Sequence, residues 1–159
     1  MPVSGTTTPA TEGRFGAAIS DPIARAQELL HTAARLPYTA SRSRQWSRRF
    51  WEKVSAAREA LQDHIRRSGQ PDSAMSRVER ELPQLRAAIE RQRIEHQLLE
   101  RKADALCEEA AAVQAADIWR MVELGEQATL LEMALSRHHN RLVRLVFESA
   151  RREFTGEAC

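Results

Sequence analysis

The sequence is poor in aromatic residues, glycine, proline and cysteine. Aromatics make up 5% of its 159 residues, and glycine and proline number six each. These counts disfavour an all-β sandwich or barrel, because such folds need many turn residues and β-formers. The only two cysteines, Cys107 and Cys159, make no disulfide framework, and we expect Cys107 to be a small buried hydrophobe. The chain also lacks an apolar run of about 18 residues and a leader-like first segment. We therefore expect a cytoplasmic protein with reduced thiols and no membrane partner.

An excess of either charge is missing too, since 24 basic residues stand against 22 acidic ones, for a net charge of +2. This balance argues against a dedicated nucleic-acid binder. Four arginines between residues 42 and 49 lie near Trp46, Phe50 and Trp51. A basic segment with aromatic residues is the alternative site, for a nucleic acid or an acidic partner. We expect instead that Phe50 and Trp51 anchor a helix whose solvated side the arginines cover. The sequence shows no phosphate-binding loop and no nucleophilic constellation, so we predict neither a nucleic-acid partner nor an enzyme.

Helix-forming residues dominate what is present: Leu, Ala, Glu, Arg and Gln. Residues 1–20 are rich in Thr, Gly, Pro, Ala and Ser and predict a disordered tail. Residues 21–156 then form one domain. Caps, prolines and apolar periodicity predict five helices, over about 22–36, 43–67 and 73–81, from 83 to a point within 110–117, and a last helix ending near 154.

The four longer helices each carry one apolar stripe with spacings of four and three residues. Four such helices predict an all-α, up-down-up-down four-helix bundle. A long dimeric coiled coil is the competing architecture, because it has the same period. Pro37, the break at 69–73 and Pro83 argue against one continuous rod.

The five histidines are distributed over all four long helices. His64, His96 and His138 lie on apolar stripes, and His31 lies beside one. A single histidine in such a stripe is usually a hydrogen-bonded core residue, but histidines on facing helices of a bundle can converge on a metal ion. Glu100 follows His96 by four residues and shares its helix face, so it is the candidate carboxylate ligand.

His138 and His139 are neighbours on one helix, so their side chains point about 100° apart. Only one of them can face the core. His138 continues the apolar stripe, and we expect His139 at the surface or the boundary.

Three segments resemble the hemerythrin-like, HHE cation-binding family. They are Trp51 with the run 61–64, the run 83–85 followed by 94–96, and the run 135–138 followed by 147–148. The glutamate ten residues after His138 is similar to that of a divergent bacterial subgroup. The resemblance implies a four-helix bundle with a mononuclear or dinuclear non-haem iron site that binds or senses O₂, or stores iron. It implies metal ligands at His31, His64, His96, Glu100 and His138.

The sequence departs from this family where the bridging carboxylates of a di-iron site are expected. Those positions hold Ser68 after the second-helix histidine and Leu142 and Val143 after the last one. A mononuclear site remains open. The alternative is a metal-free helical-bundle interaction protein that has lost the site and binds an unknown protein partner.

Overall fold

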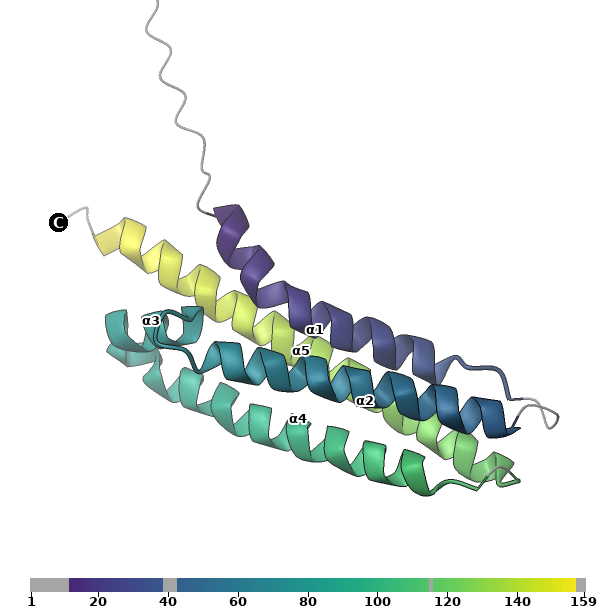
Figure 1. Cartoon of the computed structure of the whole chain (residues 1–159). Helices are drawn as coiled ribbons and strands as arrows, with labels where there is room; N and C mark the ends of the chain where they lie inside the picture. The colour runs from purple at the N-terminus through teal and green to yellow at the C-terminus, as the bar shows by residue number, and fades with distance from the viewer. Residues whose placement is uncertain (1–11, 39–42, 115, 157–159) are drawn as a thin grey trace, which may run out of the picture.

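The computed structural model describes residues 12–38, 43–114 and 116–156, which form five α-helices and one 3₁₀ turn. They are α1 (Glu12–Ala34), α2 (Ser43–Ser68), α3 (Ala74–Glu81), the turn Pro83–Leu85, α4 (Arg86–Ala112) and α5 (Ile118–Gly156). No strand occurs within these ranges, so the all-α prediction is confirmed. Four helices are long and lie side by side, and the short α3 lies at one end of them (Figure 1). No helix in the described ranges is both long and apolar enough to span a membrane.

Each long helix packs against two others, in the cyclic order α1, α2, α4, α5. The pair α2 and α4 is antiparallel, because Arg58 pairs with Asp104 at 3.7 Å while His64, later in α2, lies against His96, earlier in α4. The connection between these two helices, over residues 69–85, contains α3 and the 3₁₀ turn and reverses the direction of the chain.

Local signals set most helix ends. The Ser73 hydroxyl accepts a hydrogen bond from the backbone N–H of Ser76 and caps α3. Pro83 begins the 3₁₀ turn before α4, since its missing N–H costs nothing at a first helical position. Helix α1 starts at Glu12, earlier than the predicted start near 22, so residues 12–20 of the predicted tail are helical and residues 1–11 lie outside the described part. Pro22 is inside α1, where it removes one backbone hydrogen bond without ending the helix.

The aromatic anchor of α2 differs from the prediction. Trp46 is 3% exposed, stacks on the fully buried Phe50, and donates its indole N–H to the carbonyl of Leu36 at 3.2 Å. Trp51, the predicted anchor beside Phe50, is 44% exposed. Trp46 and Phe50 are four residues apart and share one helix face, whereas Trp51 lies about 100° from Phe50.

The core consists of two apolar clusters along the bundle axis. The larger one fills the part of the bundle that includes Leu61, Leu99 and Leu135. The smaller one joins α3 to α4 and α5 and contains Met75, Val78, Leu85, Ile89 and Leu142. Between the two clusters, each of α2, α4 and α5 places buried polar side chains, and this interruption of the core is the candidate site.

Candidate metal centre

Three histidines from three helices meet in the interior. His64 of α2, His96 of α4 and His138 of α5 are 3%, 5% and 0% exposed. Their Nε2 atoms lie 3.2 Å apart for His64 and His96, 3.3 Å for His64 and His138, and 3.0 Å for His96 and His138. Among the described residues they are a group of metal-ligating side chains whose ligand atoms lie within 4.8 Å of one another. We call these three residues the histidine triad.

The three rings point their Nε2 atoms at one another. Their centroids are 4.6 to 5.5 Å apart, clearly further than the Nε2 atoms. The interplanar angles are 59° to 88°, so the rings do not stack. Rings that converge by one nitrogen each, from three directions, place three Nε2 atoms around one point.

Glu95 holds the outer nitrogen of His138. One carboxylate oxygen of Glu95 lies 3.0 Å from His138 Nδ1, and the other pairs with Arg141. A carboxylate in this position accepts the Nδ1 proton, which leaves His138 Nε2 free as a lone-pair donor. Partial burial acts to raise the pKa of Glu95, but the hydrogen bonds from His138 and Arg141 outweigh it and lower that pKa.

Burial keeps the triad neutral. Desolvation, with the neighbouring imidazoles, lowers the pKa of His64 from 6.5 to about 3 and that of His96 to about 4. Desolvation also lowers the pKa of His138, against the opposing effect of Glu95. Neutral imidazole is the form that ligates metals.

The structure brings three of the five sequence-predicted ligands together. His31 lies outside the triad, with its side chain 45% exposed and its Nδ1 3.2 Å from a carboxylate oxygen of Glu132. Glu100 is half-buried and is not part of the cluster of ligand atoms. His139 is half-buried while His138 is fully buried, as the stripe predicted.

Two polar residues of α4 near the triad, Glu95 and Gln92, were not among the sequence-predicted site residues, although Gln92 lies on the predicted apolar stripe. Glu95 was not predicted, because it adjoins His96 in the sequence and adjacent helical residues point about 100° apart. Gln92 is 4% exposed, and its Oε1 atom has no hydrogen-bond partner. A signal for Gln92 was available, since it precedes His96 by four residues and so continues the same apolar stripe.

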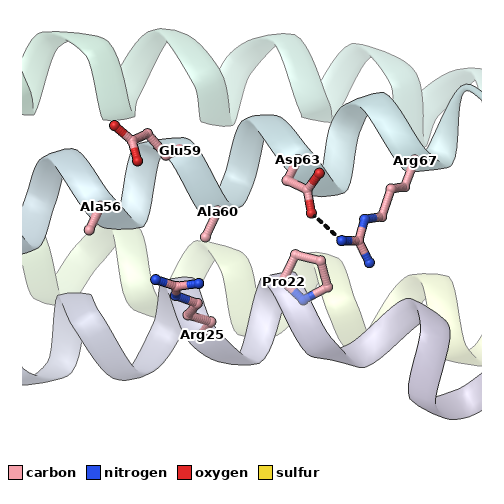
Figure 2. A pocket seen from close by; sticks show the side chains of 7 residues that line it. All are labelled: Pro22, Arg25, Ala56, Glu59, Ala60, Asp63 and Arg67. Atoms are coloured by element: carbon pink, nitrogen blue, oxygen red, sulfur yellow. Dashed lines mark ion pairs between the residues drawn. The ribbon is translucent and has the colours of Figure 1, made fainter.

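A surface pocket lies between α1 and α2 and is distinct from the triad. Its walls include Pro22 and Arg25 of α1 and Asp63 and Arg67 of α2 (Figure 2). Asp63 is paired there with Arg67 at 2.7 Å and also with Arg66. Because Asp63 is already paired with two arginines and the triad is the buried group of metal-ligating side chains, we place the candidate site in the buried layer and not in this pocket.

Cys107 is buried and unpaired, as expected of a small core residue, and burial raises the pKa of its thiol. A thiol kept neutral in this way is a poor nucleophile and a poor metal ligand. The histidine triad is therefore the chemically distinctive feature of the described interior.

Comparison with known proteins gives no match, whether against protein-family models, curated proteins or solved structures.

Proposed function

We propose that this chain is a metal-binding four-helix-bundle protein, and that His64, His96 and His138 ligate one transition-metal ion through their Nε2 atoms. The observation that carries the proposal is the convergence of three buried, neutral imidazoles on one point. Imidazole suits Fe, Zn, Cu and Ni. Glu95 completes the pattern of a carboxylate that orients a ligating histidine from its far nitrogen.

The spacing of the nitrogens supports ligation. A metal about 2.1 Å from three nitrogens separates them by about 3.0 Å at right angles and about 3.4 Å at the tetrahedral angle. The observed separations of 3.0, 3.2 and 3.3 Å fall between these values. No change in backbone position is needed to bring the three imidazoles around one ion.

Hydrogen bonding alone accounts for the triad less well. Neutral His138 donates its one ring proton, on Nδ1, to Glu95, so its Nε2 can only accept a hydrogen bond. Each of the other two rings can donate at most one hydrogen bond from Nε2, which leaves at least one of the three short N···N contacts without a proton. A cation satisfies all three lone pairs at once.

Iron is the ion we propose first, because the sequence resembles the hemerythrin-like family. With three protein nitrogens at one metal, and no carboxylate in the cluster among the described residues, a mononuclear centre is favoured over a dinuclear one. We propose that the protein acts by binding, as an O₂ or iron sensor or an iron store, and that it is not an enzyme.

Metal content tests the proposal. The protein is reconstituted anaerobically with Fe(II), and in parallel with Zn(II) and Mn(II), then desalted and analysed, with absorption spectra before and after air. We expect one ion per chain, lost in His96→Ala and retained in the matched control His31→Ala, because His31 is half-exposed and lies outside the triad. Two irons per chain would refute the mononuclear assignment.

Failure to retain any of these ions would overturn the proposed function. The triad would then be a polar core layer in a metal-free helical protein. A set of exposed apolar side chains on α4 and α5 would become the place to look for a protein partner: Ile94, Leu98, Leu130, Met133 and Phe147.

A further inference from the structure

We propose that α5 carries a self-complementary surface through which two copies of this chain associate as a two-fold symmetric dimer, with the two α5 helices antiparallel. The inference does not depend on a bound metal, because it uses the outer face of α5 and no member of the triad. It starts from exposed side chains that the packing of the helices against one another leaves uncovered.

The outer face of α5 carries a line of exposed side chains, which we call the α5 stripe. Three of them are large and apolar: Trp119 is 82% exposed, Leu130 64% and Met133 50%. Single apolar side chains on a surface need no explanation, but a group of them on one face is typical of a contact surface. The stripe consists of Trp119, Glu126, Leu130, Met133, Arg137 and Arg144, all of them exposed.

The spacing of these six residues keeps them on one face of the helix. Successive members are seven, four, three, four and seven residues apart, which is the period of the seam between two packed helices. From Trp119 to Arg144 the stripe is about 38 Å long, at 1.5 Å per residue. A second long helix can therefore lie against it along most of α5.

The order of apolar and charged residues makes the stripe complementary to itself. At its centre are Leu130 and Met133, which we call the apolar pair. Glu126 lies four residues before this pair, and Arg137 lies four residues after it. When two copies meet antiparallel at the apolar pair, Leu130 of one copy faces Met133 of the other. Glu126 then faces Arg137, and the two-fold symmetry repeats each contact.

The ends of the stripe match in the same way. Trp119 and Arg144 are equally far from the centre of the apolar pair, so the guanidinium of one copy meets the indole ring of the other. Arginine over the face of tryptophan is a favourable cation–π contact, and both residue types are enriched among those that dominate binding energy at interfaces. A parallel arrangement would oppose each charge with itself, so the charges select the antiparallel one.

The charged members of the stripe are available to a second copy. Glu126, Arg137 and Arg144 have no ion-pair partner within the part of the chain that the structure describes. Charges across an interface contribute mainly to orientation and specificity. The apolar pair therefore supplies the attraction, and the flanking charges set the register.

The neighbouring exposed face of α4 does not have this symmetry. Its apolar residues Ile94 and Leu98 are preceded by Arg91 and followed by Arg101, each at a distance of three residues. Antiparallel pairing about these two apolar residues would bring Arg91 of one copy against Arg101 of the other. Like charges oppose such contacts, so α5 is the helix at the two-fold axis.

Sedimentation equilibrium of the full-length chain, with a chelator present, tests the proposal. We expect a reversible monomer–dimer equilibrium in the wild type at about 10–100 μM protein. Glu126→Arg and Arg137→Glu should each weaken the dimer about tenfold or more, because each change creates two like-charge contacts. The matched control Glu28→Arg makes the same change of charge at an exposed residue of α1 and should leave the equilibrium unchanged.

Mixing the two single variants separates the proposed contact from a general effect of charge. Glu126→Arg carries two basic side chains in the stripe beside the apolar pair, and Arg137→Glu carries two acidic ones. The mixture should therefore form a one-to-one heterodimer that is stronger than either homodimer. The double variant Glu126→Arg/Arg137→Glu restores opposite charges at both contacts and should dimerise like the wild type.

Three results would overturn the inference. A wild type that stays monomeric over this range does not use the stripe for self-association, which leaves the stripe to a different partner or to solvent. A dimer that both single variants leave intact is formed by another surface. Monomeric single variants that do not form the heterodimer would show that Glu126 does not face Arg137. Circular dichroism verifies the fold of each variant, and metal retention by the triad is measured separately.

Discussion

The apoprotein should lose stability steeply when the pH falls from 7 to 5. An unfolded histidine has a pKa near 6.5, whereas the folded pKa values are about 3 for His64 and about 4 for His96. Below pH 6.5 the unfolded chain therefore binds more protons than the folded chain, and each proton favours unfolding. Above pH 6.5 both residues are mainly neutral in the folded and the unfolded chain, and the fold keeps its full stability. As the pH falls from 6.5 toward the folded pKa values, that stability is lost progressively.

The size of this effect follows from the two shifts. At pH 5 an unfolded imidazole is almost fully protonated, while both buried rings remain neutral. Linkage then gives a loss of about 2 kcal/mol for each ring between pH 7 and pH 5, or about 4 kcal/mol together. This is a large fraction of the stability of an ordinary domain, about 5–15 kcal/mol.

Urea unfolding at pH 7, 6 and 5, with a chelator present, measures the effect. The double variant His64→Leu/His96→Leu should lose about 4 kcal/mol less than the wild type over this range. The control His31→Leu should behave like the wild type, because it leaves the buried layer unchanged. A wild-type free energy of unfolding that is equal at pH 7 and pH 5 within about 1 kcal/mol would show that the triad is solvated or already protonated, and the reasoning would fail.

Three further predictions use the same protein. Glu95→Ala should weaken metal binding about 10- to 100-fold because His138 Nδ1 loses its acceptor, whereas Glu100→Ala should change it less than twofold, as isothermal titration calorimetry would show; equal effects would contradict the assignment. Trp46→Ala should cost about 3–5 kcal/mol in urea unfolding and Trp51→Ala less than about 1 kcal/mol, and the reverse order would restore Trp51 as the anchor. At pH 7, free metal at about 100 times its dissociation constant should stabilise the fold by about 2.7 kcal/mol, an increase that a chelator removes and that His96→Ala abolishes.

Sequence periodicity was enough to place the three histidines in the interior. His64, His96 and His138 each continue an apolar stripe, and a stripe can only face the interior of a helical protein. The breaks near Pro37, Gly69 and Pro83 indicated the helix ends well, because proline and glycine act locally. What periodicity cannot supply is the axial register between helices, which decided that the three histidines share one layer.

The same limit applies within a single helix, where Glu100 was the predicted polar neighbour of His96 and the buried one is Gln92. Both residues are four positions from His96, and each four-residue step turns the helix by about 40° beyond a full turn. Gln92 and Glu100 therefore lie on opposite sides of His96. Only the packing of α2 and α5 decides which side is inward, and it selects Gln92.

The buried polar layer lowers the stability of the fold unless something binds in it. Two apolar clusters lie above and below it, and leucines in place of its polar residues would join them into one continuous core. Instead the chain keeps three neutral imidazoles whose Nε2 atoms converge and a glutamine whose carbonyl oxygen has no hydrogen-bond partner among the described residues. Buried polar groups with no partner destabilise a fold, and proteins tolerate that cost chiefly at functional sites. A metal ion held by the triad would satisfy the three Nε2 atoms together. Apoprotein stability should therefore rise, and metal binding disappear, when the triad is replaced by leucine.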